Sequence, residues 1–441
     1  MKRGLTLAVL GLLLGGCGGG SPQNAPPGNS EARRAKLHDS VKSTPFKHVL
    51  WESILPAVDV THVSLRADSL FIEVVETSGD RKGKTALYRV NTRNGVVEGV
   101  VDLPAPLDFR PAMVDSIVRE IAQLEADRER LLKERDVEAT RKDKNVTKVE
   151  GLSDQIVKKT DLINSMKAQD RVYAVSTHDW LHVIERPAMA ELERERLAFV
   201  PSTAAAASPS VVFIGALERN RLIGLDPITW AEILFFPADA DIRTTPIVAE
   251  PGNVYFASED GHVYGYTADG RAKLIDYETE AAIVCDMCLD IEKDEGGKEK
   301  WGALFVASTD YALYCFNRIS GELLWKYETG SELRTTPRVS GDVAYVYARQ
   351  KGLHAIDKRT GKLLYIKQDA WFPIARGKDR VFIAGPNHRE VISVEERTGR
   401  ELGRASIAEF AHIASEPGSR TVYLVTDDGF IFAAKESEID Y

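Results

Sequence analysis

The sequence feature that most constrains the fold is a short turn motif that recurs along the chain. Its clearest copies are "NRISGELLWKYETG" at 317–330 and "KRTGKLLYIKQ" at 358–368. A polar residue opens each turn, a glycine usually follows four positions later, and an apolar run ending in an aromatic residue comes next. Turns of this kind open at Asn91, Asp226, Asn317, Asp357 and Glu395.

The spacing of these turns defines the repeat. The residues Trp230, Gly270, Gly321, Gly361 and Gly399 lie 40, 51, 40 and 38 positions apart, and the long interval contains the polar insertion "EKDEGGKEK". The period is therefore about 40 residues, which is typical of a repeat architecture. The opening acid or amide can accept hydrogen bonds from backbone N–H groups two or three residues on. Glycine at the fourth position permits a positive φ.

Pairs of short strands lie between the turns. Segments such as 253–266 and 342–357 alternate Val, Ile, Tyr and Phe with other residues, and each follows a copy of Arg-Thr-Thr-Pro, at 243–246 and 334–337. Four strands in about 40 residues make a β-propeller blade. Eight strand cores can be counted from 63–90 to the C-terminus, and residues 46–53 could supply the last outer strand. We therefore predict an all-β fold, an eight-bladed β-propeller of four-stranded blades, with seven blades as the alternative.

Residues 112–170 interrupt the strand pattern with apolar residues at helical spacing. Charged residues fill the other positions, and a polar link separates two apolar seams, so the pattern predicts an antiparallel α-helical hairpin (a coiled coil) inserted in the propeller. A packing element on the domain face and a projecting arm for a partner both remain open. The seam residues are Ile117, Ile121, Leu124 and Leu131 in the first helix and Val149, Leu152, Ile156, Ile163 and Met166 in the second.

The stretch "AIDKRTGKLLY" at 355–365 resembles the tryptophan-docking motif A-x-D-x-x-T-G-x-x-x-W of pyrroloquinoline-quinone-type (PQQ-type, or quinoprotein-like) propeller repeats. Tyr365 stands where that motif ends in tryptophan, whereas 317–325 keeps both the glycine and Trp325. The resemblance covers roughly residues 60–440 apart from the hairpin. It implies that the aromatic residue packs between adjacent blades.

The N-terminal sequence "MKRGLTLAVLGLLLGGC" predicts export and lipidation. Two basic residues precede a short apolar run, and Leu14-Gly15-Gly16-Cys17 resembles the bacterial lipobox. We expect a signal peptide at 1–16, lipid attachment at Cys17, a flexible tether at 17–45 and the propeller at 46–441. The acyl chains would anchor the protein stably in the bacterial cell envelope. In lipoproteins, a residue other than Asp after the acylated cysteine implies release to the outer membrane, and Gly18 fits this pattern, so the resemblance implies the outer membrane and its periplasmic side.

The remaining cysteines and the charge limit the other partners. In an oxidising compartment Cys285 and Cys288 could close a small disulfide, and Cys315 lies in an alternating strand as a small core residue. No second cysteine pair completes a zinc site, so no metal is expected. The formal charge is -9 with no Lys/Arg-rich face, so nucleic acid is not expected as a partner.

Two groups of proteins share this repeat and differ in function. Quinone-dependent dehydrogenases hold the cofactor and Ca²⁺ in the central funnel, commonly beside two adjacent cysteines, and this chain has no adjacent cysteine pair. BamB-like lipoprotein propellers hold no cofactor and serve outer-membrane β-barrel assembly. The lipobox, tether and repeat resemble the second group.

This resemblance implies a non-enzymatic, lipid-anchored scaffold for envelope protein partners, with no cofactor, no catalytic residue and the barrel-assembly machinery as the expected partner. A periplasmic or surface binding or sensing propeller of other purpose is the alternative. A PQQ-dependent dehydrogenase is a third hypothesis.

Overall fold

The structure is a computed structural model of the full chain. It describes residues 30–436 with the exception of 57, 142–144, 168, 177–178, 268, 386–387 and 417. The expected signal peptide and Cys17 lie outside the described residues.

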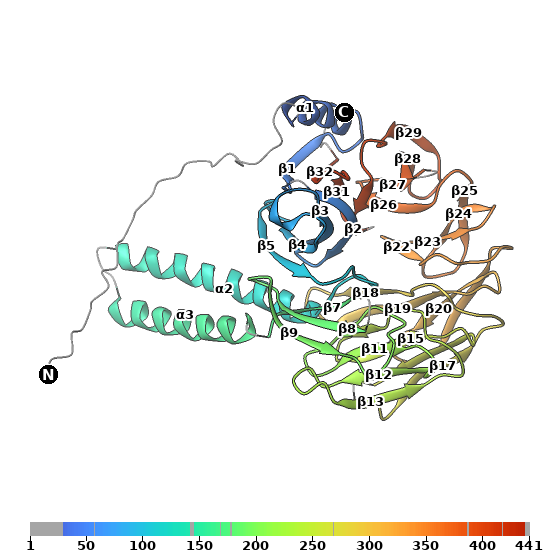
Figure 1. Ribbon diagram of the computed structural model, residues 1–441, viewed down its shortest axis with the longest axis horizontal. Helices are drawn as coiled ribbons and strands as arrows, with labels where there is room; N and C mark the ends of the chain where they lie inside the picture. Colours follow the sequence, from blue (N-terminus) through green and yellow to red (C-terminus); the bar gives the residue numbers. More distant parts are fainter. Residues whose placement is uncertain are drawn as a thin grey trace.

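The described residues form eight four-stranded antiparallel sheets that surround a central axis as blades (Figure 1). In each blade the first strand lies nearest the axis and the last strand lies outermost. Blades one to four consist of β2 (Val58–Arg66), β3 (Ser69–Glu76), β4 (Thr85–Asn91) and β5 (Val97–Leu103); β6 (Ala112–Met113), β7 (Arg171–Ser176), β8 (Trp180–Glu185) and β9 (Ala190–Arg196); β10 (Ala206–Ala207), β11 (Val212–Ala216), β12 (Arg221–Leu225) and β13 (Glu232–Pro237); and β14 (Ile247–Ala249), β15 (Asn253–Ala257), β16 (His262–Tyr266) and β17 (Lys273–Glu278).

The second half of the ring has the same construction. Blades five to eight consist of β18 (Cys288–Lys293), β19 (Glu299–Ala307), β20 (Ala312–Asn317) and β21 (Leu323–Glu328); β22 (Arg338–Ser340), β23 (Val343–Ala348), β24 (Gly352–Asp357) and β25 (Leu363–Lys367); β26 (Phe372–Arg376), β27 (Arg380–Ala384), β28 (Glu390–Glu395) and β29 (Glu401–Ser406); and β30 (His412–Ala414), β31 (Thr421–Val425), β32 (Phe430–Lys435) and β1 (His48–Ile54). A short 3-10 turn, η1 (Gly79–Arg81), lies in blade one.

The ring is closed by a strand from the beginning of the described chain. Strand β1 pairs antiparallel with β32, from His48 opposite Lys435 to Ile54 opposite Phe430. This pairing confirms that residues 46–53 contribute to the outer strand of the last blade, and it confirms eight blades instead of seven.

The hydrophobic core is a ring of interfaces between neighbouring blades. Eight apolar clusters are formed by the described residues, and each cluster joins two adjacent blades, including blades eight and one. Because a blade has a neighbour on both faces, its two middle strands are almost wholly buried, as in β3 and β15. The outermost strands are partly exposed, as in β13 and β29.

The repeated turns have the geometry that the sequence predicts. Asp357 Oδ1 accepts hydrogen bonds from the N–H groups of Arg359 at 3.2 Å and Thr360 at 2.9 Å. Gly361, four positions after Asp357, has a φ of 70°. In blade three the same place is taken by Trp230, with a φ of 58°.

The aromatic residue of the motif packs between blades, as the resemblance implies. The Trp325 indole lies against Gly361 of the next blade, where an added Cβ would come within 2.7 Å of the ring, and its Nε1 donates to the Lys358 carbonyl oxygen at 3.0 Å. Tyr365 lies against Gly399 in the same way.

One sequence expectation needs correction. Within the expected flexible tether at 17–45, the described part contains a helix, α1 (Ser30–Lys42). Its Leu37 and Val41 are fully buried against the interface of blades seven and eight, because their i, i+4 spacing places them on one helix face. The Arg33 guanidinium also contacts Glu409 at 2.7 Å.

Candidate functional site at the base of the hairpin

The helical hairpin consists of α2 (Asp115–Thr140) and α3 (Val146–Lys167), inserted between β6 and β7 of blade two. In a meander of antiparallel strands, the connection from first to second strand lies at the same end as the connection from third to fourth. The hairpin therefore leaves the ring on the face that carries the repeated turns, and we call this end the hairpin face.

The base of the hairpin belongs to the propeller core. Ile117, Ile121 and Ile163 share an apolar cluster with residues of blades two and three, and Val118 joins the cluster between blades one and two. All four side chains are less than a tenth exposed. The start of α2 and the end of α3 are thus fixed to three blades.

Beyond its base the hairpin is held by its own two helices. Leu131 and Leu152 are buried, and the Lys159 ammonium lies 3.2 Å from the Asp127 carboxylate across the helix pair. The 26 residues of α2 give a length of about 39 Å at about 1.5 Å per residue.

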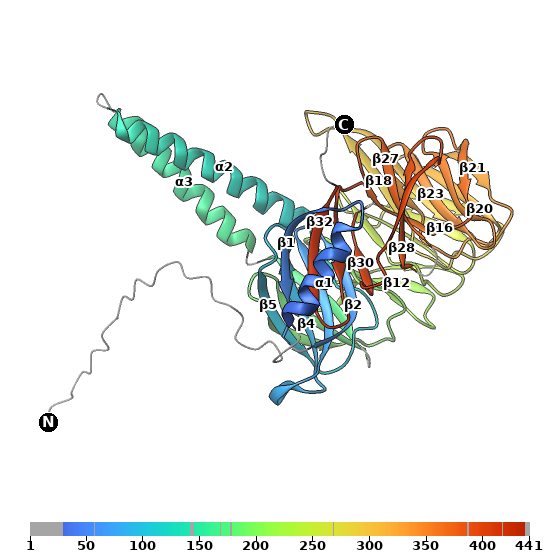
Figure 2. The same cartoon turned by 90° about the horizontal axis from the view of Figure 1, so that it is seen from above.

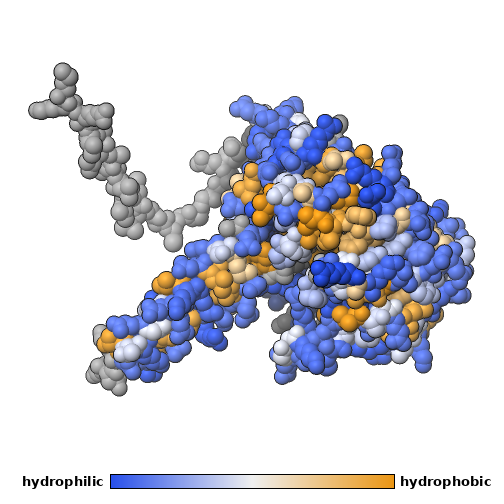
Figure 3. All heavy atoms as spheres, turned by 90° about the horizontal axis from the view of Figure 1, so that it is seen from below, coloured by the Kyte–Doolittle hydropathy of each residue, from blue (hydrophilic) through white to orange (hydrophobic). Residues whose placement is uncertain are grey.

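The two helices run side by side and project away from the ring (Figures 1 and 2). In Figure 3 the outer end of the hairpin is mainly hydrophilic, and apolar side chains gather on the body of the propeller. The hairpin is therefore a packing element at its base and a projecting arm beyond it. No helix among the described residues is long and apolar enough to cross a membrane.

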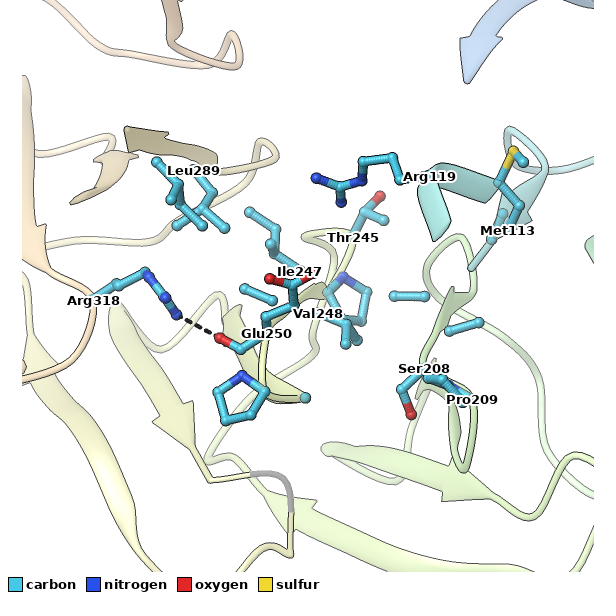
Figure 4. A pocket seen from close by; sticks show the side chains of 18 of the residues that line it. Met113, Arg119, Ser208, Pro209, Thr245, Ile247, Val248, Glu250, Leu289 and Arg318 are labelled. Carbon is cyan, nitrogen blue, oxygen red and sulfur yellow. Dashed lines mark hydrogen bonds between the residues drawn. The ribbon is translucent and has the colours of Figure 1, made fainter. Parts of the chain in front are cut away.

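A cavity of about 1270 Å³ opens where the arm meets the ring, and we call it the hairpin-base cavity (Figure 4). The first strands of blades two to five, β6, β10, β14 and β18, provide its walls, and α2 contributes Arg119. It therefore lies at the hairpin-face end of the central axis.

The lining of this cavity carries more positive than negative side chains. Five cations, Arg66, Arg110, Arg119, Lys293 and Arg318, face two carboxylates, Glu250 and Glu299. Lys293 Nζ lies 2.7 Å from Glu250 Oε2, and Arg318 Nε lies 3.0 Å from Glu299 Oε1. The lysine contact and the charges of Arg119 and Arg318 lower the pKa of Glu250, so it stays ionised.

Figure 4 shows Arg119 and Arg318 approaching Glu250 from two sides of the cavity. A third carboxylate, Asp286, lies next to the lining and accepts from Arg110 at 2.9 Å and from the Thr245 N–H at 2.6 Å. The carboxylates here are thus already held by cations or backbone donors.

The cysteines singled out in the sequence lie elsewhere, in the interface of blades five and six. Cys285, Cys288 and Cys315 are free thiols in the structure, and the disulfide between the first two stays a prediction. Burial raises the pKa of Cys285 and of Cys288 to about 12, and neighbouring aspartates add to the effect. The thiolate form is therefore suppressed and neither thiol is an activated nucleophile.

A serine, a histidine and a glutamate of blade two form a chain that sequence reasoning did not find. His182 Nε2 lies 2.7 Å from Ser176 Oγ, and its Nδ1 lies 2.7 Å from Glu191 Oε1. These distances match a hydrolytic triad, but Ser176 and His182 are fully buried and do not line the hairpin-base cavity. These hydrogen bonds connect β7, β8 and β9.

The lining of the hairpin-base cavity carries side chains of both charges. In the part of the chain that the structure describes, no group of three or more His, Cys, Asp or Glu side chains is arranged to hold a metal ion. Asp226 and Asp357, the best-matched acids of the repeat, cap turns through backbone N–H groups.

Comparison with known proteins identifies the fold. The family model described as outer membrane protein assembly factor BamB matches residues 300–438. No curated protein matches the sequence. BamB from Moraxella catarrhalis superposes with a TM-score of 0.55 and 11% identity, covering 88% of this chain and 99% of that chain. The computationally designed Ika8 protein superposes with a TM-score of 0.52 and 13% identity over the same shares of the two chains.

The chain therefore has a PQQ-type, BamB-like β-propeller fold. The family match begins inside β19 of blade five. Helices α2 and α3 and most walls of the hairpin-base cavity lie outside the matched residues, so the candidate site belongs to the part of the chain that the family model does not cover.

Proposed function

We propose that the protein is a non-enzymatic, lipid-anchored scaffold of the bacterial cell envelope that acts in outer-membrane β-barrel assembly. The observation that carries the proposal is the BamB-like fold, supported by a sequence match in blades five to eight and by superposition on BamB. The lipobox ending at Cys17 supports an anchor at the outer membrane, on its periplasmic side.

The geometry suits a scaffold in two ways. The ring is fixed by apolar interfaces between all neighbouring blades, so it presents its loops and arm in one arrangement. The arm is rigidly based and reaches well beyond the ring, so a partner could be bound at a distance from the propeller. Attachment to the membrane would raise the effective concentration of membrane-bound partners.

Affinity purification from solubilised envelopes tests the proposal. The full chain should retain β-barrel assembly proteins, identified by mass spectrometry. A matched variant in which a short Gly-Ser link replaces residues 122–162 keeps Ile117, Ile121 and Ile163, so its ring should fold, and it reports whether the arm carries the contact. Absence of every barrel-assembly component from the full-chain sample would overturn the proposal.

The anchor needs its own measurement. Cys17→Ser should leave an unprocessed precursor and abolish labelling by a fatty-acid analogue. Unchanged processing and membrane attachment in this variant would refute the lipid anchor while leaving the scaffold proposal open to the purification test.

The arm favours one alternative, a binding propeller that serves a different envelope complex, because α2 and α3 lie outside the family match. Partners that depend on residues 122–162 but include no barrel-assembly protein would support this alternative. The dehydrogenase hypothesis predicts alcohol-dependent dye reduction after addition of quinone and Ca²⁺. We expect none, and such activity would refute the non-enzymatic proposal.

A further inference from the structure

We propose that the face of the ring opposite the hairpin lies against an anionic phospholipid surface, which it contacts through cations and aromatic side chains of blades six and seven. The inference rests on the lipid anchor of the proposed function and adds how the anchored ring is oriented. The arm would then leave the ring on the side away from the membrane.

We call the end of the ring without the hairpin the opposite face. In a meander of antiparallel strands, the connections from the second to the third strand and from the fourth strand to the next blade lie at this end. The opposite face therefore carries the connections between β23 and β24, between β25 and β26, and between β27 and β28.

Aromatic side chains form a continuous strip on these connections. The ring centre of Trp371 lies 5.6 Å from that of Tyr347 and 5.0 Å from that of His388, and the His388 ring lies 5.1 Å from that of Phe372. The Trp371 side chain is large and apolar, yet 39% of Trp371 is exposed. Tryptophan and tyrosine are enriched at membrane interfaces because each has an apolar ring and a polar group that can bond to water or headgroups.

Three cations flank this aromatic strip. Arg349 and Lys351 follow Tyr347 in the turn between β23 and β24, and Arg389 follows His388 directly. All three residues are exposed, and none of the three forms an ion pair with another residue that the structure describes. Their charge is therefore open to an anionic surface, which attracts Lys and Arg near it.

The carboxylates of the opposite face indicate which part of it approaches the membrane. Asp369 and Glu390 lie beside the aromatic strip, and both contact Arg404. Further acidic residues of this face, such as Asp239 and Asp310, belong to blades three to five. An anionic surface would attract blades six and seven and repel blades three to five, so we expect the ring to lie tilted on the membrane.

The described chain also begins on this face. In the first turn of α1, Arg33 contacts Glu409 at 2.7 Å, and Glu409 lies in the connection between β29 and β30. In the same connection the N–H of Ile407 donates to the Arg389 carbonyl oxygen at 2.7 Å, so the start of α1 and the cations are neighbours. The stretch from Cys17 to α1 can span at most about 45 Å, so a lipidated Cys17 would hold this face close to the membrane.

Quenching of tryptophan fluorescence tests the inference with the lipidated protein. The protein is purified from envelopes and reconstituted into vesicles of phosphatidylethanolamine and phosphatidylglycerol that carry a spin label on part of their headgroups. Trp371→Phe should remove most of the quenched emission. Trp301→Phe is the matched control, because Trp301 is partly buried near the hairpin-face end of β19, and it should leave the quenching unchanged. Quenching that does not depend on Trp371 would overturn the proposal.

Removal of the three charges tests the electrostatic part of the contact. The combination of Arg349→Gln, Lys351→Gln and Arg389→Gln should lower the quenching of Trp371 by about half or more, because the attraction to anionic headgroups is lost. Vesicles of phosphatidylcholine alone, which carry no net charge, should have the same effect on the parent protein. Unchanged quenching in the combined variant would contradict a charged contact with the membrane.

The matched control removes three cations from the hairpin face. It combines Arg93→Gln, Lys378→Gln and Arg397→Gln, which lie at exposed positions in connections of that face. It changes the net charge by the same amount and should leave the quenching of Trp371 unchanged. An equal loss of quenching in the two combinations would show that the opposite face has no special role.

The outcomes separate this orientation from the proposed function. If the purified protein carries no acyl chain and does not stay on the vesicles, the anchor and the orientation both fail. If the lipidated protein stays on the vesicles but Trp371 is not quenched, the anchor stands and the orientation is wrong. If the three substitutions of the opposite face leave the quenching unchanged and release a protein partner in affinity purification, these cations bind a protein and the membrane contact is refuted.

Discussion

Lys358 follows Asp357, which opens the turn of blade six, and its ammonium is buried between two blades. Nζ lies 2.8 Å from Asp290 Oδ2 and 2.6 Å from Glu292 Oε1, both on β18 of blade five. Lys358→Ala would leave Asp290 without its cation, although Glu292 keeps its contact with Arg359 at 2.7 Å. We expect this loss to cost about 2–4 kcal/mol of unfolding free energy. Thermal unfolding followed by circular dichroism should show a midpoint lowered by several degrees.

Lys133→Ala is the matched control, because its side chain is 75% exposed on the outer part of α2 and its ion pair with Glu129 is on the surface. It should leave the midpoint unchanged. Similar midpoints for the two variants would mean that the buried contact of Lys358 contributes nothing to the joining of blades five and six.

Buried cations at this place in the repeat could not be recognised from the sequence alone. Arg186 and Arg318 occupy the equivalent position after the third strands of blades two and five, and each reaches the preceding blade, at Asp68 and at the Glu250 carbonyl oxygen. A cation in a polar turn suggests an exposed side chain. The available signal was the recurrence of a cation at one repeat position, directly after an acidic or amide residue.

His182 provides a pH-dependent contribution to stability. Burial lowers its pKa below the unfolded value of about 6.5, although hydrogen bonding to Glu191 opposes the shift. The folded protein therefore favours the neutral imidazole, and this stabilisation is complete above about pH 6.5 and is lost as the pH falls through the lower folded-state pKa. Burial also lowers the pKa of His354, so we expect the melting temperature to fall between about pH 7 and pH 5.

His182→Gln separates this contribution from the rest. The variant should melt at a lower temperature at neutral pH, because it loses the hydrogen bonds that join His182 to Ser176 and Glu191. Its unfolding midpoint should, however, fall less steeply on acidification. Parallel pH profiles for the variant and the parent protein would show that His182 does not titrate in the unfolding transition.

The hairpin is an element whose two halves differ in what supports them. Leu131 and Leu152 are buried between α2 and α3, beyond the part of the hairpin that packs on the blades. Leu131→Asp combined with Leu152→Asp should separate the outer helices, because two carboxylates would be buried without partners. Hydrogen exchange should show loss of amide protection in residues 122–162 and unchanged protection in the blades.

Val157→Asp is the control for this pair, since Val157 is 58% exposed on α3 and should tolerate a charge. If the double variant also lost protection in β7 and β11, the arm would be part of one cooperative unit with the ring instead of an appended element.

The sequence predicted the helices of the hairpin, but it did not predict their contacts with the blades or the presence of α1. The apolar seams predicted both helices and the link between them, since that pattern is local. They did not show that Ile117, Ile121 and Ile163 would join the propeller core, because those contacts come from blades two and three. Helix α1 was missed because only Leu37 and Val41 of its mainly polar sequence are buried.

At the scale of the whole molecule, the sequence repeat predicted the blade count and the closure of the ring. This was possible because each blade is formed by one continuous stretch of about 40 residues, and neighbouring blades pack against each other in the same way. The hairpin-base cavity could not be predicted in this way. The cations that line it are spread along the sequence from Arg66 to Arg318, and only the circular arrangement of the blades brings them to one end of the axis.

The closure of the ring makes the sharpest whole-molecule prediction. Strand β1 completes blade eight, and Trp51 on it lies against Gly95 of blade one, with Nε1 donating to the Thr92 carbonyl oxygen at 2.9 Å. Deleting residues 46–54 would remove this contact and leave the edge of β32 unpaired. An unpaired edge strand recruits another chain, so size-exclusion chromatography with light scattering should show association beyond the parent's state.

An added peptide and a point variant distinguish closure of the ring from a general loss of packing. A synthetic peptide of residues 46–54 should restore the parent's behaviour if pairing with β32 is what the deletion removed. Trp51→Ala keeps the strand and removes only the indole, so it should lower the melting temperature without association. We expect the same of Trp325→Ala at the equivalent contact of blades five and six. If the deletion variant kept the parent's size and midpoint, the ring would be held by the interfaces of the other blades, and strand β1 would be dispensable for closure.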